Sequence, residues 1–130
     1  MIIEHVAFVV RDPEAVSSWY CDHLGLREIR RGGGGDIFVS DDDDSTILQL
    51  EDARLVGEEE TIADHWSRDA RQLHLAFNTD DVNGLCHRLL EAGATMEGDI
   101  IVTADGDEMV LLRDPWGLPF QLVKRKEKMK

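Results

Sequence analysis

The chain has 130 residues, 42% of them hydrophobic and 32% charged, which is typical of one soluble globular domain with a sizeable core. No apolar run is long enough to cross a bilayer, and no basic N-terminal region with a cleavage site is visible, so we expect a cytoplasmic protein that does not enter membranes. The net charge of −13 repels phosphate backbones and therefore argues against a nucleic-acid partner.

The charge is unevenly distributed along the chain. All four Lys residues lie within the last seven residues, whereas residues 1–123 hold 9 Arg and 26 Asp or Glu, a net charge of −17. Such a body attracts cations, although high solubility is its ordinary consequence. We expect the basic tail to be a solvated chain end, because a run of charges without apolar residues cannot pack.

The first fifty residues predict a strand, a helix and three further strands. Apolar residues alternate over 2–10, Asp12 is placed to cap a helix, and Gly25 is placed to end it. A glycine run at 32–35 and an acidic run at 41–44 predict turns between the later strands. We expect strands at 2–10, 26–31, 36–40 and 45–50.

The second half predicts the same order of elements. Asp80 or Asp81 is placed to cap a helix that ends at Gly93, and residues 114–117 have the Asp-Pro-Trp-Gly pattern of a type I turn. Between the halves, the acidic segment 52–71 predicts a long connection with one short helix over 61–66. We expect strands at 72–79, 95–103, 108–113 and 119–124.

Two short motifs show that the halves are copies of one unit. His5-Val-Ala-Phe returns 69 residues later as His74-Leu-Ala-Phe, and Gln49 returns 72 residues later as Gln121, each inside a predicted strand. Nearly equal offsets indicate a duplicated βαβββ module. We therefore expect an α+β fold in a single domain. Its parts are module one at 1–51, a linker at 52–71, module two at 72–124 and a basic tail at 125–130.

The repeat gives His5, Gln49, His74 and Gln121 a common place. Successive side chains of a strand point to opposite faces, and in each module the apolar residues that flank these four occupy the face that packs on the helix. The four polar side chains therefore project from the other face of each sheet. If the two sheets curve around each other, these faces line a cavity.

The chain resembles the vicinal oxygen chelate superfamily, also called the glyoxalase/bleomycin resistance/dioxygenase superfamily. The resemblance covers nearly all of residues 2–124. It is carried by His5-Val-Ala-Phe-Val-Val, Trp19-Tyr-Cys-Asp-His-Leu-Gly-Leu, His74-Leu-Ala-Phe, and Arg113-Asp-Pro-Trp-Gly leading to Gln121. It implies two βαβββ modules that form paired curved mixed sheets, commonly in a homodimer that binds a small molecule.

The resemblance also implies a metal site. Metal-dependent members hold a divalent cation (Ni, Zn, Co, Mn or Fe) with side chains from the first and fourth strands of each module, which here are His5, Gln49, His74 and Gln121. The cation stabilises negative charge on substrate oxygens, as in lyases and isomerases of the lactoylglutathione lyase and epimerase types. The preferred interpretation is a metal-assisted lyase or isomerase with a small oxygenated substrate.

One position departs from the pattern of the enzymes. Epimerase-like members carry Glu where this chain has Gln121, and a Gln amide binds a hard cation through its oxygen but accepts no proton at neutral pH. We therefore expect weaker metal binding than at a carboxylate site, and no catalytic base is assigned. The iron site of the ring-cleaving dioxygenases also requires a carboxylate that these four positions lack.

One alternative function stays open. A metal-free protein of the bleomycin-resistance type would sequester a ligand without catalysis, and the acidic body would suit a cationic drug.

Cys21 and Cys86 have neither metal spacing nor an activating motif, so we expect reduced thiols on helices. We expect His23, His65 and His87 at the surface.

Overall fold

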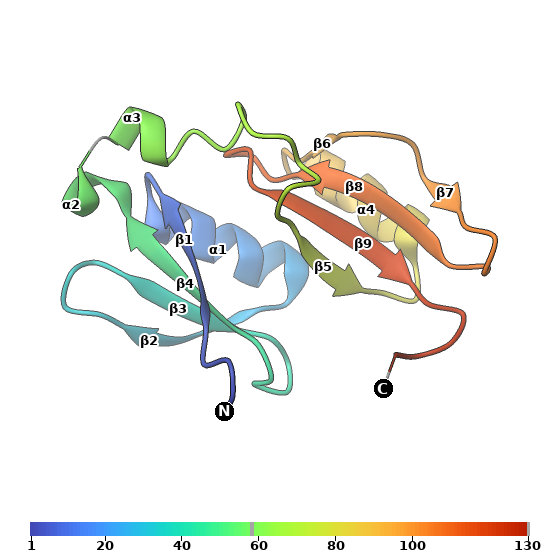
Figure 1. The fold of residues 1–130 in the computed structure, drawn as a ribbon, viewed down its shortest axis with the longest axis horizontal. Helices are drawn as coiled ribbons and strands as arrows, with labels where there is room; N and C mark the ends of the chain where they lie inside the picture. Colours follow the sequence, from blue (N-terminus) through green and yellow to red (C-terminus); the bar gives the residue numbers. More distant parts are fainter. Residues whose placement is uncertain (58, 130) are drawn as a thin grey trace. The chain divides into compact units, whose positions relative to one another are not determined.

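The computed structural model describes residues 1–57 and 59–129 and contains two compact units, Met1–Asp64 and His65–Lys130 (Figure 1). Each unit is an α+β module with its own mixed sheet, as the sequence predicts. Across these described ranges, none of the helices is both long and apolar enough to span a bilayer. The prediction that both modules form a single domain stays a prediction.

The first unit builds its sheet in the order β1-β4-β3-β2. Strand β1 runs parallel to β4, and the other neighbours are antiparallel. Helix α1 covers one face of this sheet (Figure 1). The elements are β1 Val6–Val10, α1 Pro13–Leu24, β2 Arg27–Arg31, β3 Ile37–Ser40, β4 Ile47–Asp52, α2 Ala53–Val56 and α3 Glu59–Ile62.

The core of the first unit lies between α1 and its sheet. Asp12 accepts a hydrogen bond from the Ala15 amide at 3.0 Å, and Gly25 ends the helix in the left-handed region at a φ of 72°, so both predicted caps are confirmed. Alternate residues of the strands are buried against this helix. They include Phe8, Val10, Ile37, Val39, Leu48 and Leu50, with Val16, Trp19 and Tyr20 of α1 on the other side.

The second unit repeats the plan with the order β5-β9-β8-β6, and β7 also pairs with β8. Strand β5 is parallel to β9, and helix α4, capped by Asp81, covers one face of the sheet (Figure 1). The elements are β5 Leu75–Asn78, α4 Val82–Glu91, β6 Thr95–Met96, β7 Ile101–Val102, β8 Glu108–Arg113 and β9 Pro119–Lys124. The single strand expected at 95–103 is therefore wrong, because two short strands pair with different parts of β8.

The segment between the modules also differs from its prediction. Two short helices, α2 and α3, replace the one expected at 61–66, and the chain from His65 onward belongs to the second unit. His65, expected at the surface, is only 7% exposed. Its carbonyl accepts a hydrogen bond from the buried guanidinium of Arg113 at 2.8 Å, which holds this stretch against β8. His23 and His87 are exposed as predicted, and Cys21 and Cys86 are free thiols on α1 and α4.

Candidate functional site

Strand register makes the predicted site residues of the two units equivalent. In the first unit, Ala7 of β1 is the Cα partner of Gln49 in β4, and in the second unit Ala76 of β5 is the Cα partner of Gln121 in β9. The two His residues stand two positions before these Ala residues and share their face. Two residues of a strand span about 7 Å, so in each unit the His stands about this far along the strand from the Ala that pairs with the Gln.

His5 immediately precedes β1 and is one-third exposed, with 34% of its side chain accessible. Its Nδ1 is paired with the carboxylate of Glu4, and its ring stands edge-on to Phe38 at 5.9 Å between centroids. Histidine ligands of metals commonly have a carboxylate on the ring nitrogen that does not bind the ion, because it fixes the tautomer. Glu4 therefore orients His5 so that Nε2 is the nitrogen available to a ligand or a metal.

Gln49 is also fixed in orientation by a carboxylate. Its amide nitrogen Nε2 donates a hydrogen bond to Oδ2 of Asp36 at 2.7 Å. A carboxylate repels the amide oxygen, so this contact determines which branch of the amide faces Asp36. The carbonyl oxygen, which is the atom a cation would use, lies on the other branch.

His74, immediately before β5, has a different environment. Its Nδ1 is buried and has no hydrogen-bond partner within the part of the chain that the structure describes. A buried polar atom without a partner costs on the order of 1–3 kcal/mol, so such atoms often belong to sites that are completed by a ligand. This unpaired nitrogen distinguishes His74 from His5.

Gln121 contacts a thioether where Gln49 contacts a carboxylate. Its Nε2 lies 3.6 Å from Sδ of Met109, which is a weak acceptor. Phe38 pairs with Gln49 and Leu111 pairs with Gln121, so Asp36 and Met109, each two residues earlier, occupy equivalent positions. The same register therefore holds one amide by a charge and leaves the other weakly held.

Imidazole nitrogens and amide oxygens are both atoms that bind divalent cations, although these four side chains carry no negative charge. Imidazole nitrogen suits Ni, Zn, Co and Fe, and amide oxygen suits harder ions such as Mn. No group of three or more His, Cys, Asp or Glu side chains is placed to hold an ion in residues 1–57 and 59–129. Within each unit, a cation at these positions would depend on the Gln oxygen as well as on the imidazole.

Sequence reasoning did not identify Asp36 and Met109 as neighbours of the site. Asp36 lies in a predicted strand, and alternation from Phe38 would have put it on the face of Gln49. The missing information was the register between β3 and β4, which depends on how the loop 41–46 closes. The same reasoning applies to Met109, which lies inside a predicted strand.

Comparisons with known proteins agree with this architecture. The family model of the Glyoxalase/Bleomycin resistance protein/Dioxygenase superfamily matches residues 2–122. No curated protein matches the chain. Members of this superfamily often bind divalent metals.

Three solved structures share the fold at low sequence identity. A glyoxalase family protein from Bacillus cereus has a TM-score of 0.79 and 18% identity, with 95% of this chain and 93% of that chain covered. A glyoxalase/bleomycin resistance protein/dioxygenase family enzyme from Burkholderia phytofirmans has a TM-score of 0.73 and 21% identity, with coverage of 93% and 96%. A superfamily member from Sphaerobacter thermophilus has a TM-score of 0.72 and 18% identity, with 96% of this chain and 98% of that chain covered. Because the family model spans nearly the whole chain and the fold agrees, this chain belongs to the glyoxalase/bleomycin resistance protein/dioxygenase superfamily.

Proposed function

We propose that this protein is a divalent-metal-assisted lyase or isomerase that acts on a small oxygenated molecule in the cytoplasm, as a homodimer. His5, Gln49, His74 and Gln121 are the proposed metal ligands. When bound, the cation supplies stabilisation of negative charge on a substrate oxygen. The observation that carries the proposal is the matched register of the two units, which gives each one an imidazole and a carboxamide on the face that its helix leaves open.

The side chains around the ligands have separate tasks in this proposal. Glu4 fixes the ring of His5, and Asp36 fixes the amide of Gln49. Asp36 also brings a carboxylate to this face, and its Oδ1 is not the atom that Gln49 contacts. We assign Oδ1 of Asp36 as the proton acceptor, because neither Gln can take up a proton at neutral pH.

Metal binding to the purified protein tests the ligand set directly. The protein is stripped with a chelator and titrated with Ni²⁺, Zn²⁺, Co²⁺, Mn²⁺ and anaerobic Fe²⁺, and bound metal is counted by elemental analysis and calorimetry. If all four residues serve one ion, the stoichiometry is one ion per chain, and His5→Ala and His74→Ala each weaken binding at least about tenfold. Two independent sites per chain would instead show that each half acts alone.

A surface histidine provides the matched control. His87 is exposed on α4, where its ring faces Glu91, so His87→Ala removes an imidazole without touching the proposed site. This variant is expected to bind metal like the original protein. Equal losses in the His87, His5 and His74 variants, or no binding of any of the five ions, would refute the proposed ligand set.

A second candidate function is metal-free sequestration of a cationic small molecule. It is favoured by the net charge of −17 over residues 1–123 and by a donor set that contains no carboxylate. A cationic glycopeptide that raises the melting temperature of the metal-stripped protein, while no ion binds stoichiometrically, would favour this function instead.

A further inference from the structure

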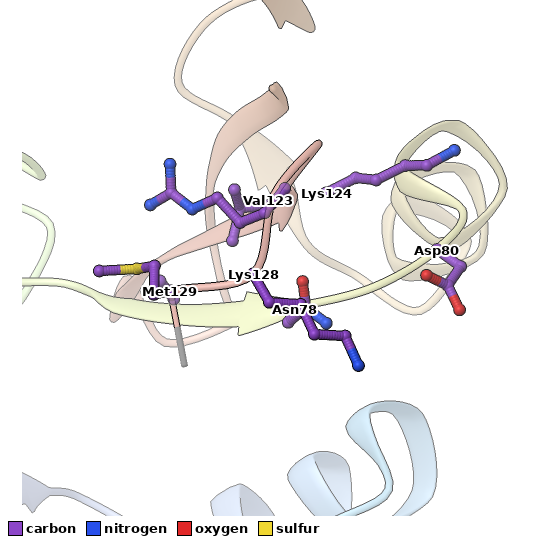
Figure 2. Close-up of a pocket in the computed structure, with 8 residues that line it drawn as sticks. Asn78, Asp80, Val123, Lys124, Lys128 and Met129 are labelled. Carbon is purple, nitrogen blue, oxygen red and sulfur yellow. The ribbon is translucent and has the colours of Figure 1, made fainter. Parts of the chain in front are cut away.

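The second unit contains a cavity of about 420 Å³ beside the ends of β5 and β9 (Figure 2). Part of its wall is apolar and consists of Ala76 from β5, Val123 from β9 and Met129 from the C-terminal tail. Asn78 adds an amide to the same wall. The tail runs past the ends of β5 and β9, so the cavity lies between the sheet and the last residues of the chain.

Three cations also line the cavity. Lys124 ends β9, Arg125 follows it, and Lys128 comes from the tail. The ammonium group of Lys124 points away from Lys128 and Asn78 (Figure 2). Arg125 also donates a hydrogen bond to Asp107 at 2.7 Å, and Asp80 is the acidic residue among those that line the cavity. The cavity is therefore locally positive in a chain whose net charge is −13.

The tail is held in place by defined contacts. The amide of Lys126 donates to Oδ1 of Asp107 at 2.9 Å, and Arg125 binds the other oxygen of the same carboxylate. These two bonds anchor the chain immediately before Lys128. Residues 126–129 are exposed, as expected of a solvated tail, but these two bonds hold the start of the tail to the second unit.

The cavity continues the face that carries the second pair of proposed ligands. Ala76 is the Cα partner of Gln121, and Val123 stands two residues after Gln121 on the same side of β9. A molecule bound against Ala76 and Val123 would therefore extend along the sheet toward Gln121. This places the charged end of such a molecule among the cations and its other end near the proposed ligands.

We propose that this cavity binds a small organic anion, a carboxylate with an apolar body, and that it sets the substrate class of the protein. The apolar wall takes the body, while Lys128 takes the carboxylate, with the amide of Asn78 as a further donor. That this anion is the substrate rests on the proposed function. Binding of the anion itself does not, because the cavity lies within the second unit and needs no metal.

Three compounds of one shape and different charge test the proposal. Benzoate, benzamide and benzamidine are titrated into the metal-stripped protein, and binding is followed by amide chemical shifts of residues 76–78 and 123–128. We expect benzoate to bind with a dissociation constant on the order of 1 mM, as is usual for a fragment of this size, and to bind more tightly than the other two. Its affinity should fall as salt rises.

Substitutions in the tail separate a local site from a general charge effect. Lys128→Gln should weaken benzoate binding about two- to fivefold, the range for partly exposed ion pairs. Lys126→Gln is the matched control, since it removes the same charge from the same tail but its side chain lies against Gly106 and not in the cavity. Ala76→Leu, which leaves every cation in place, should also abolish binding because it fills the apolar wall.

The outcomes of this test are independent of metal binding. Equal losses for the Lys126 and Lys128 variants, tighter binding of benzamidine than of benzoate, or shifts that avoid residues 76–78 would each overturn the proposal. If benzoate binds as expected but no ion does, the anion site stands and the metal-assisted function falls. If ions bind and benzoate does not, the reverse holds.

Discussion

In the first unit the amide nitrogen of Gln49 donates to a carboxylate, whereas in the second unit the amide nitrogen of Gln121 contacts a thioether. The strand order and the register around these residues are the same. The two imidazoles differ as well, since His5 is paired with Glu4 and His74 has a buried nitrogen without a partner in the described chain. Duplication thus preserved the positions of four donors, while their surroundings diverged into one firmly oriented pair and one loosely held pair.

A further difference concerns what supports each sheet. Arg113 of β8 is 5% exposed. Its guanidinium donates hydrogen bonds to the carbonyls of His65, Arg68 and Gly117. It also forms an ion pair with Glu97 and lies over the ring of Trp66. The equivalent position in β3 is Ser40, whose hydroxyl makes a single 3.3 Å hydrogen bond to the carbonyl of Thr46. In the second unit, the buried guanidinium of Arg113 therefore holds the segment that contains His65 and Arg68 against the sheet.

The largest expected effect is loss of this cation. Arg113→Met should lower the free energy of unfolding by about 3–5 kcal/mol, because it leaves Glu97 unpaired and removes the donor from three backbone carbonyls. Ser40→Ala, at the equivalent position, should cost only about 0.5–1.5 kcal/mol. Urea denaturation measures both, and similar values for the two variants would show that the units are supported alike.

Placing a carboxylate at each Gln position in turn sharpens the comparison of the sites. Gln121→Glu should strengthen metal binding about tenfold or more, because a charged ligand replaces a neutral one. Gln49→Glu should gain less, because the new carboxylate would face Asp36 across the 2.7 Å contact and one of the pair would tend to hold a proton. Calorimetric titration at neutral pH measures both affinities; an equal gain would mean that Asp36 does not contact position 49 in solution.

The neighbours of the two Gln residues can be changed as a matched pair. Asp36→Asn removes the charge that orients Gln49 and should weaken metal binding about tenfold, the range for groups that orient a ligand. Met109→Leu changes the equivalent neighbour of Gln121 and should have little effect, since a thioether holds an amide weakly. If Met109→Leu proved the more harmful variant, the assignment of the first unit as the firmly oriented one would be wrong.

Sequence patterns predicted the equivalence of the two Gln positions but not the side chains that contact them. The repeat and the alternation of side chains predicted that Gln49 and Gln121 occupy equivalent places, and the register with Ala7 and Ala76 confirms it. These features follow from local periodicity. The contact between Asp36 and Gln49 depends on how one hairpin closes, which the composition of a turn does not determine.

Other failures have the same origin in long-range contacts. His65 is buried because a segment far along the chain, carrying Arg113, binds its carbonyl. The predicted strand at 95–103 breaks because β6 and β7 pair with different ends of β8, and the side chain of Glu97 in the gap pairs with Arg113. A pattern of apolar residues cannot reveal the contacts of His65 and Glu97, since both are made by the buried side chain of Arg113.

The smallest expected effect concerns the tail, which the first unit lacks. The hydrogen bond from Arg125, followed by that from the Lys126 amide, lowers the pKa of Asp107 below its ordinary value. A carboxyl whose pKa is lower in the folded state stabilises that state fully above the ordinary pKa, and this contribution disappears as the pH falls through the lowered value. Tail docking should therefore be constant from about pH 5 to 8 and weaken only below about pH 4.

Asp107→Asn should loosen the tail at neutral pH, with severalfold faster hydrogen exchange at the Lys126 amide, whereas Asp105→Asn, in the same turn, should not. Loss of tail protection between pH 5 and 7 would mean that a group other than Asp107 anchors it.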